Sequence, residues 1–240
     1  MATLFVSDLH LDDARPESTR LFGDFLAGEA RIADALYILG DLFEAWVGDD
    51  DPSATGAVIA EWLKALSDEG VPVFFLHGNR DFLLGEAYAL RAGMTLLPDP
   101  TRIDLHGKPT LLMHGDLLCT GDDEYHRFRA QTRDPGWQRQ FLSQPLEARL
   151  AFAKQARGES ARHQGVLREA DTMETITDVA PAAVDAAFAA HGVDALIHGH
   201  THRPAIHRDG GRTRIVLGDW YTQGSLLRVD AQGPRLSTPP

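Results

Sequence analysis

Short apolar runs that end in small or polar residues recur along the chain. A continuous apolar run of four to eight residues, bounded by turn residues, is typical of a strand that is buried on both faces. We therefore predict buried strands that each end in a polar loop. The runs are Leu4–Val6, Leu36–Leu39, Val73–Leu76, Leu111–Met113, Leu196–Ile197 and Ile215–Leu217, and the polar residues after them are Ser7–Asp8, Gly40–Asp41, His77–Asn79, His114–Asp116, His198–His200 and Gly218–Asp219.

Helical periodicity lies between the early strands, at Thr19–Ala30 and Thr55–Glu69, and Gly70 and Pro72 close the second pattern. Alternation of strand and helix favours an α/β fold. Arg102–Leu105 and Thr110–Leu118, with His106–Gly107–Lys108 between them, read as a β-hairpin, so we expect a mixed sheet.

Residues 122–170 have a different pattern of apolar and polar positions from the rest of the chain. In this segment the apolar residues stand singly in a background rich in Arg and Gln, and Pro135–Gly136 and Pro145 interrupt it. This pattern predicts several short amphipathic helices inserted between two strands. We call residues 122–170 the cap, and we expect it to lie within a single domain spanning residues 1–240. The apolar residues are Tyr125, Phe128, Trp137, Phe141, Leu142, Leu146, Leu150 and Phe152.

Composition narrows the class of protein. A chain of 240 residues, 43% of them hydrophobic and 24% charged, can bury one sizeable core. The net charge of -12 argues against a nucleic-acid partner, because a phosphate backbone is bound mainly by Lys and Arg. The charge is unevenly distributed along the chain. The stretch from Glu124 to Arg168 contains nine basic and four acidic residues, so it is net positive.

No apolar stretch approaches the roughly 18 residues of a membrane span, and no basic segment precedes Thr3–Val6. We therefore expect neither export nor a membrane-spanning anchor. Cys119 is the single cysteine, which excludes an internal disulfide and fits a reducing compartment, with the cytoplasm as the expected location. Nothing marks Cys119 as a nucleophile, so we interpret it as an inert small residue near the site.

Seven side chains that bind metals well follow these strands, and the carboxyl ends of strands are where α/β sheets build ligand sites. In Asp8-x-His10, two ligands would lie on the same side of an extended chain. Seven ligands are too many for one closed zinc site and suit two divalent ions about 3.5–4 Å apart. Without a thiolate, Mn²⁺, Fe²⁺ and Zn²⁺ all fit. The seven are Asp8, His10, Asp41, Asn79, His114, His200 and His202.

Simpler interpretations exist for each motif alone. An isolated Asp-x-His is most often a surface turn, and Asp after Gly is a common turn residue. The conjunction of these motifs, each at a strand end, favours metal binding instead. We interpret His77 as a packed strand residue, and we leave open whether His198 orients a ligand imidazole or is merely buried. His106, His191 and His207 are expected to be solvated.

The motifs resemble the signature of the calcineurin-like metallophosphoesterases from residue 7 to about residue 220, which implies layered mixed β-sheets flanked by helices. The chain resembles most closely the branch that acts on UDP-2,3-diacylglucosamine in lipid A biosynthesis. Many superfamily members have His where this chain has Arg80, which replaces the usual proton donor with a fixed cation. The runs that carry the closer resemblance are residues 5–11, 39–50, 77–83, 114–116, 119–122 and 197–204.

The resemblance implies a role for each residue. Asp8, His10, Asp41 and His202 would hold the first metal ion, and Asp41, Asn79, His114 and His200 the second. Arg80 and Asn79 would contact the reacting phosphate, with His200 beside it, and Asp122, Ser160 and Gln164 the glucosamine–phosphate region. The stretch of residues 164–171 is longer than the corresponding stretch in the family. The family has a basic substrate ligand near this place, and here that ligand is either Arg168 or no residue at all. The cap would form an acyl-chain groove.

The implied reaction is hydrolysis of the pyrophosphate in UDP-2,3-diacylglucosamine, with Mn²⁺ the expected ion. The products would be UMP and 2,3-diacylglucosamine 1-phosphate, after activated water attacks the α-phosphorus. One alternative is a related enzyme acting on another nucleotide or phosphodiester. The other is a non-catalytic metal-binding scaffold, which predicts a missing ligand, and none of the seven is missing.

A diacylated substrate would lie in a bilayer, so we expect a peripheral protein on the inner surface of the cell membrane, with no obligate protein partner. The cap is both basic and studded with apolar residues, which suits an anionic leaflet. Arg133, Arg139 and Arg149 are the basic residues expected to contact it. The alternative is that Trp137, Phe141 and Leu150 form the ordinary core of a small helical subdomain.

Overall fold

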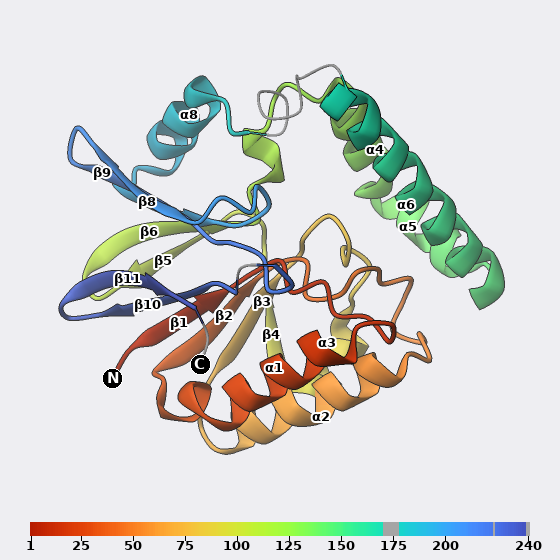
Figure 1. Ribbon diagram of the computed structural model, residues 1–240, viewed down its shortest axis with the longest axis horizontal. Helices are drawn as coiled ribbons and strands as arrows, with labels where there is room; N and C mark the ends of the chain where they lie inside the picture. The colour runs from red at the N-terminus through yellow and green to blue at the C-terminus, as the bar shows by residue number, and fades with distance from the viewer. Residues whose placement is uncertain (170–177, 223, 239–240) are drawn as a thin grey trace.

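Two β-sheets stacked face to face form the centre of the computed structural model, which describes residues 1–169, 178–222 and 224–238, apart from the side chains of residues 161 and 163–169 (Figure 1). The first sheet has six strands in the order β11-β10-β1-β2-β3-β4, and the second has five in the order β5-β6-β7-β9-β8. Strands β1 to β4 are parallel, as are β6, β7 and β9, whereas β10, β11, β5 and β8 pair antiparallel with their neighbours. The predicted mixed α/β fold is confirmed.

The strand bounds agree well with the apolar runs where these are continuous. The first sheet comprises β1 (Thr3–Val6), β2 (Ala35–Leu39), β3 (Val73–Leu76), β4 (Met94–Leu97), β10 (Leu226–Asp230) and β11 (Gly233–Ser237). The second comprises β5 (Thr101–Leu105), β6 (Lys108–Met113), β7 (Ala195–His198), β8 (Ala205–Asp209) and β9 (Arg212–Val216).

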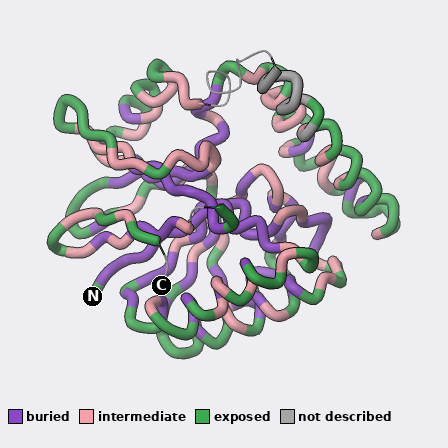
Figure 2. The backbone as a smooth tube through the Cα atoms, viewed as in Figure 1, coloured by how far each residue is buried: buried purple, intermediate pink, exposed green. Residues whose placement is uncertain are grey.

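Both faces of the first sheet are covered, which explains its uninterrupted apolar strands. Helices α1 (Pro16–Ala27), α2 (Ala54–Asp68) and α3 (Glu86–Ala92) cover the outer face (Figure 1). Because side chains alternate along a strand, Leu4 and Val6 pack in the core under these helices, whereas Phe5 packs in the core between the sheets. Figure 2 shows β1, β2 and β3 as largely buried.

Helix α8 (Pro181–His191) covers the other sheet, and its Phe188 packs with Leu111, Met113 and Leu196. Two short 3₁₀ helices, η1 (Glu29–Ile32) and η2 (Asp116–Leu118), connect larger elements. Within the described part of the chain, no helix is both long and apolar enough to cross a membrane.

Two predicted boundaries were wrong. The first helix spans Pro16–Ala27 rather than Thr19–Ala30, since Pro16 is preorganised for a first helical turn and Gly28 follows the last one. The second hairpin strand ends at Met113 rather than Leu118. Gly115 has a φ of 119° and turns the chain into η2.

The cap consists of α4 (Asp123–Thr132), α5 (Pro135–Leu142) and α6 (Leu146–Glu169), which lie together beside the carboxyl ends of the strands (Figure 1). The Asp134 side chain accepts a hydrogen bond from the backbone N–H of Trp137 at the start of α5. The prediction of several short helices was wrong for α6, which has 24 residues. Gly158 is tolerated there, since a single glycine weakens a helix by only about 1 kcal/mol.

Candidate metal centre

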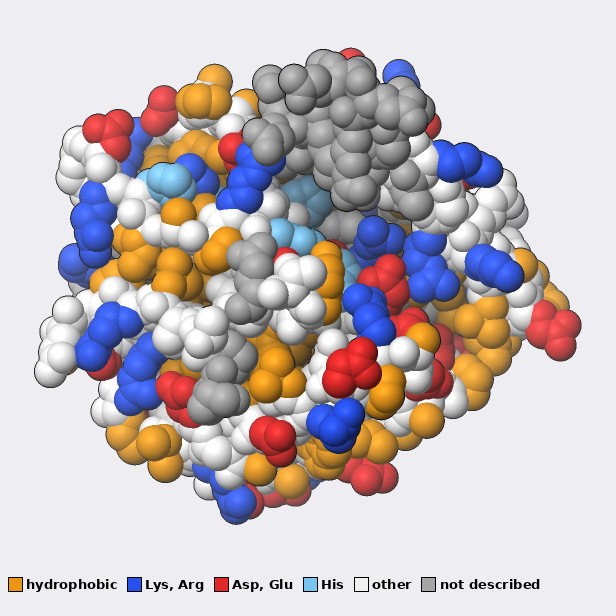
Figure 3. Space-filling view, viewed as in Figure 1, with side chains coloured by type: hydrophobic (Ala, Val, Ile, Leu, Met, Phe, Trp, Pro, Cys, Tyr) orange, Lys and Arg blue, Asp and Glu red, His pale blue; other side chains and the backbone are white. Residues whose placement is uncertain are grey.

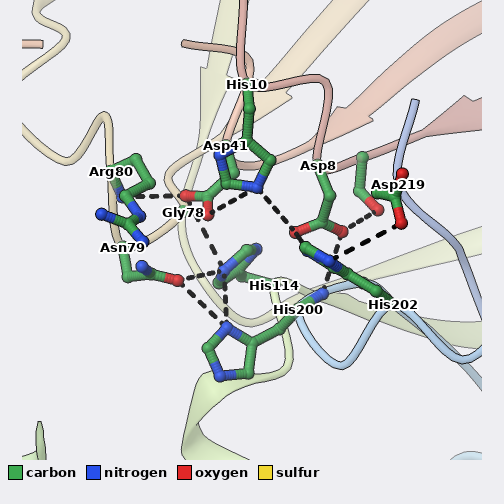
Figure 4. A network of polar contacts seen from close by, with 12 residues as sticks. Asp8, His10, Asp41, Gly78, Asn79, Arg80, His114, His200, His202 and Asp219 are labelled. Atoms are coloured by element: carbon green, nitrogen blue, oxygen red, sulfur yellow. Dashed lines mark hydrogen bonds and ion pairs between the residues drawn. The ribbon is translucent and has the colours of Figure 1, made fainter. Parts of the chain in front are cut away.

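The predicted ligands follow β1, β2, β3, β6 and β7, and they meet where the two sheets converge (Figure 4). The expectation of an extended chain at Asp8-x-His10 was wrong. Asp8 and His10 have φ values of 54° and 49°, in the left-handed region, and Asp41, His200 and His202 share this conformation. Such backbone is unusual outside glycine and collects at functional sites. Hydrogen bonds between the loops hold it, including His10 N–H to Asp41 O at 2.9 Å.

Asp8, His10 and His202 form one half of the centre. Nε2 of His202 lies 3.2 Å from Oδ1 of Asp8, and Nε2 of His10 lies 4.0 Å from the same oxygen. Ser7 Oγ and the His200 backbone N–H donate to the other oxygen of Asp8, at 2.5 Å and 2.9 Å. The Asp8 carboxylate is thereby oriented with Oδ1 toward the two imidazoles.

Asn79, His114 and His200 form the other half. Oδ1 of Asn79 lies 2.9 Å from Nε2 of His114 and 3.0 Å from Nδ1 of His200, and these two ring nitrogens are 3.2 Å apart.

Asp41 stands between the halves, with Oδ2 3.7 Å from His10 Nε2 and Oδ1 3.9 Å from His114 Nε2. The structure thus brings together all seven residues predicted from the sequence.

The donor set fits divalent cations. Oδ1 of Asp8 and Nε2 of His10 are buried without a hydrogen-bond partner among the described residues. Leaving such atoms unsatisfied costs free energy that a bound cation would offset. Asp8, His10 and His202, and also Asp8, Asp41 and His114, each offer ligand atoms within 4.8 Å of one another. The oxygen and imidazole donors suit Mn²⁺, Fe²⁺ or Zn²⁺.

Carboxylates and imidazoles shift one another's pKa values. Burial alone would raise the pKa of Asp8, but the adjacent imidazole of His202 outweighs it and leaves that pKa well below its usual range. Burial would lower the pKa of His114, yet the charges of Asp41, Asp8 and Asp116 raise it to about 9. Burial and then the charge of His114 lower the pKa of His200 to about 4. Because a ligand imidazole binds a cation in its neutral form, the raised pKa of His114 makes metal binding at this residue compete with protonation.

Glycines let the loops approach one another. A Cβ atom on Gly78 would lie 2.1 Å from Oδ1 of Asp41, and one on Gly199 would lie 2.3 Å from Oδ2 of Asp8. Next to Gly78, the buried Asp81 accepts backbone N–H groups from Leu42 at 2.7 Å and Gly78 at 2.9 Å. Asp81 therefore joins the loop after β2 to the loop after β3.

The other histidines stand as follows. His77 follows β3 rather than lying in it and is half-buried, with Nε2 2.7 Å from the Leu84 carbonyl. His198 is buried, with Nδ1 2.9 Å from the Gly199 carbonyl and Nε2 accepting from Arg214 at 3.2 Å. These contacts favour the merely buried interpretation, since neither ring nitrogen has a hydrogen bond to a ligand imidazole among the described residues. His106 and His207 are exposed, as expected.

A pocket opens beside the metal centre, between the cap and the loops after β2 and β3. We call it the cap pocket. Asn79, Arg80, Asp122 and Ser160, all predicted site residues, line it. The side chains of Gln164 and Arg168 lie outside the described residues. The large apolar side chains in its wall are Trp46, Phe82, Leu83, Phe128, Phe141 and Phe152.

Sequence reasoning missed three polar residues around the site. Glu44 and Arg157 line the cap pocket, and Arg157 could have been found from its place one helical turn before Ser160 on α6. Asp219 lies 3.8 Å from Nδ1 of His202 through Oδ2, on the side of the ring away from Asp8 (Figure 4). The Gly–Asp pair after an apolar run was the available signal for Asp219.

Two of the three arginines expected at a membrane fasten the cap to the core instead. Arg133 donates to the Gly78 carbonyl at 2.7 Å. Arg149 is buried, donates to the Val47 carbonyl at 2.6 Å and pairs with Asp50. Unlike these two, Arg139 is exposed. The expectation was therefore wrong for Arg133 and Arg149, because basic side chains of an amphipathic helix also bond to backbone carbonyls beneath it.

The apolar residues of the cap also fall into two groups, one packed against the core and one exposed. Trp137 and Phe141 stack with ring centroids 4.8 Å apart and pack with the core under α1 to α3, rather than forming with Leu150 the separate core of a small helical subdomain. Leu142, Leu150 and Phe152 remain substantially exposed, and Phe152 also reaches the cap pocket. Cys119 is buried, and burial raises the pKa of its thiol to about 12, so it is a poor nucleophile.

Comparison with known proteins places the chain among phosphoesterases. The family described as calcineurin-like phosphoesterase matches residues 1–204. A UDP-2,3-diacylglucosamine hydrolase of Stenotrophomonas maltophilia (strain K279a) is 65% identical, over 99% of this chain and 98% of that protein. A UDP-2,3-diacylglucosamine hydrolase of Xanthomonas campestris pv. campestris (strain B100) is 65% identical over 97% of each. Among solved structures, a phosphoesterase from E. coli aligns with a TM-score of 0.48 at 17% identity, covering 96% of this chain and 89% of that one.

Proposed function

Because the chain belongs to the calcineurin-like phosphoesterase family and is a hydrolase, we propose that it cleaves the pyrophosphate bond of UDP-2,3-diacylglucosamine. The products are UMP and 2,3-diacylglucosamine 1-phosphate, and the reaction belongs to lipid A biosynthesis. The observation that carries this proposal is the cap pocket, which is lined both by large aromatic side chains and by Asn79 and Arg80 beside the metal centre. A substrate with acyl chains at one end and a pyrophosphate at the other matches this combination of apolar and polar lining.

The metal ions are divalent, as the family implies, and we propose Mn²⁺ as the native one. Asp8, His10, Asp41 and His202 would hold one ion. Asp41, Asn79, His114 and His200 would hold the other, with Asp41 shared between them. Bound at such a centre, two divalent ions lower the pKa of water to near neutrality and neutralise charge on the reacting phosphate.

The protein's own residues orient the substrate. Arg80 presents a fixed cation to the pyrophosphate, and its buried Nε has no hydrogen-bond partner among the described residues. Asn79 and His200 lie beside the same phosphate. Asp122 and Ser160 line the pocket where the glucosamine would lie, and we propose Gln164 and Arg168 as further sugar or phosphate contacts.

Arg80 also bears on the chemistry of the leaving group. A guanidinium is a fixed cation and a poor proton donor, so Arg80 stabilises charge rather than acting as an acid. The leaving sugar phosphate is already a weak base and needs no protonation by a histidine. Water attacks the α-phosphorus, and the phosphate that leaves is stabilised by the guanidinium.

Membrane association is the second part of the proposal. The diacylated substrate resides in a bilayer, and we propose that the protein meets it as a peripheral protein on the cytoplasmic face of the inner membrane. Exposed apolar and basic residues on the cap support this, namely Leu142, Leu150, Phe152, Arg127, Arg139 and Lys154. We also propose that the cap, residues 122–170, is an insertion within one domain of residues 1–240.

A substrate panel tests the proposal against its alternatives. Purified protein with Mn²⁺ is given UDP-2,3-diacylglucosamine, UDP-N-acetylglucosamine and bis(p-nitrophenyl) phosphate at equal concentrations, and UMP or nitrophenol is quantified. We expect rapid hydrolysis of the diacyl substrate only. Faster hydrolysis of either other compound would favour a related phosphoesterase of different specificity. No hydrolysis of any compound by metal-loaded protein would favour a scaffold.

A further inference from the structure

A single carboxylate, that of Glu44, lies between the metal centre and three arginines. Glu44 belongs to the loop after β2 and is 23% exposed. Its Oε2 lies 3.2 Å from Nδ1 of His10 and accepts a hydrogen bond from Arg15 at 3.0 Å. Its Oε1 lies 4.0 Å from NH1 of Arg80 and 4.0 Å from NH1 of Arg157.

We propose that Glu44 is a positioning residue with two tasks: it orients His10 toward the metal centre, and it gathers Arg15, Arg80 and Arg157 beside the place of the substrate pyrophosphate. The second task rests on the proposed function. The first does not, because it concerns only the cation that His10 binds.

The two ring nitrogens of His10 face different partners. Nε2 points to the metal centre, 3.7 Å from Oδ2 of Asp41, and Nδ1 points to Glu44. A carboxylate beside Nδ1 favours the tautomer that carries its proton there, which leaves the lone pair of Nε2 available for a cation. Arg15 joins this support, because it donates to the His10 carbonyl at 2.7 Å as well as to Glu44.

The three arginines come from separate parts of the chain. Arg15 precedes α1, Arg80 follows β3 and Arg157 lies on α6 of the cap. Like charges repel, so their convergence requires an anion. Among the described residues, Glu44 is the carboxylate that pairs with all three. Figure 3 shows Lys and Arg side chains around acidic ones next to the histidines.

The charges complement a pyrophosphate diester. One carboxylate against three guanidiniums leaves two positive charges, and a pyrophosphate with two esters carries two negative ones. Arg15 donates to both His10 and Glu44 through the same terminal nitrogen, so its bonds to these two residues leave its other N–H groups available to an anion. Glu44 therefore holds the cluster together before substrate binds without neutralising it.

Two substitutions at Glu44 separate the tasks. Glu44→Ala removes both the acceptor and the charge, whereas Glu44→Gln keeps an oxygen that can accept from His10 Nδ1 but removes the charge. The matched control is Glu29→Ala, because Glu29 is 22% exposed, pairs with Arg228 at 2.7 Å and lies away from the site. Chelated proteins are titrated with Mn²⁺ by equilibrium dialysis, without substrate, and KM and kcat are then measured with UDP-2,3-diacylglucosamine.

We expect Glu44→Ala to weaken Mn²⁺ binding by about 10- to 100-fold, the usual effect of losing a carboxylate behind a ligand histidine. Glu44→Gln should weaken it less, and both variants should raise KM. Glu29→Ala should match the wild type in every measurement. If circular dichroism shows that Glu44→Ala is unfolded, the KM of Glu44→Gln tests the second task. The Mn²⁺ affinity of Glu44→Leu, whose side chain has no hydrogen-bond acceptor, then tests the first.

Wild-type Mn²⁺ affinity in Glu44→Ala or Glu44→Leu would overturn the first task. An unchanged KM in Glu44→Gln would overturn the second. The dialysis measurement uses no substrate, so it reports on Glu44 even if the wild type fails to hydrolyse UDP-2,3-diacylglucosamine. In that case the proposed function and the second task fall together, while the first is decided by dialysis alone.

Discussion

His202 Nε2 lies 3.2 Å from Oδ1 of Asp8, although Asp8 follows the first strand of one sheet and His202 follows β7 of the other. The metal centre therefore bridges the sheets, and it assembles only when they are packed together. Substitution of a ligand should remove the centre without removing the core, because the core between the sheets is made of other residues, such as Phe5, Leu39 and Ile197.

We predict that His10→Ala and Asp41→Ala each reduce turnover at least about 100-fold, more than the loss of a supporting partner usually causes. Asp41 stands between both halves of the centre, so its loss should affect both ions. Steady-state rates and metal content per chain are measured together, with circular dichroism as the check on folding. Near-normal turnover by either folded variant would contradict a role for these residues in the reaction.

Arg80→Ala should lower kcat by about 100-fold, comparable with the loss of one charge-stabilising donor in other enzymes. Arg80→His should recover only part of this loss, because an imidazole does not reproduce the forked guanidinium. The backbone N–H of Arg80 donates to Oδ1 of Asp41 at 2.8 Å, and this bond survives either substitution, so metal content should not change. A fully active Arg80→His variant would show that this position does not distinguish the substrate class.

The seven predicted ligands could be found from the sequence because each lies in the short loop that follows a buried apolar run. The left-handed backbone at Asp8, His10 and Asp41 could not, since it depends on contacts between loops that are distant in the sequence. Glu44 was missed for the same reason, as its partners come from three other segments: the loop after β1, the loop after β3 and α6. Strands β8 and β11 lacked continuous apolar runs because they are edge strands, where solvent replaces one face of the core.

Acid should destabilise the metal-free protein partly through His198. Burial, opposed by its bond to Gly199, lowers the pKa of His198 from 6.5 to about 3. Below pH 6.5 the unfolded chain takes up a proton that the folded chain does not, so stability falls as the pH falls toward 3. Between pH 6.5 and 4.5 His198 therefore lowers the free energy of unfolding by about 2 kcal/mol, since one pKa unit corresponds to about 1.4 kcal/mol.

Urea unfolding of chelated protein at these pH values measures the effect. The His198→Gln variant should be less stable at neutral pH, yet its stability should depend less on pH. Equal pH dependence in variant and wild type would assign the acid sensitivity to other groups.

The cap surface gives a membrane prediction that avoids the arginines fastening it to the core. Replacing the exposed Arg127, Arg139 and Lys154 with Glu should weaken sedimentation with anionic liposomes at least about ten-fold, at about 1 kcal/mol per basic residue. Hydrolysis of detergent-dispersed substrate should change little. Raised salt should mimic the substitutions, because such attraction is screened over about 10 Å.

The matched control replaces Arg102, Lys108 and Arg208, which are equally exposed but lie on the second sheet. Equal losses in both triple variants would mean that net charge, not the cap, governs liposome binding. If neither variant nor salt changes binding, the cap recognises the substrate through its pocket alone.

The most direct test of the central claim is the fate of heavy oxygen during turnover. Chelated protein reconstituted with Mn²⁺ hydrolyses UDP-2,3-diacylglucosamine in ¹⁸O-labelled water, and both products are examined by mass spectrometry. Attack on the α-phosphorus predicts one labelled oxygen in UMP, none in the sugar phosphate, and no products from chelated protein. Label in 2,3-diacylglucosamine 1-phosphate, or equal turnover without metal, would contradict the account.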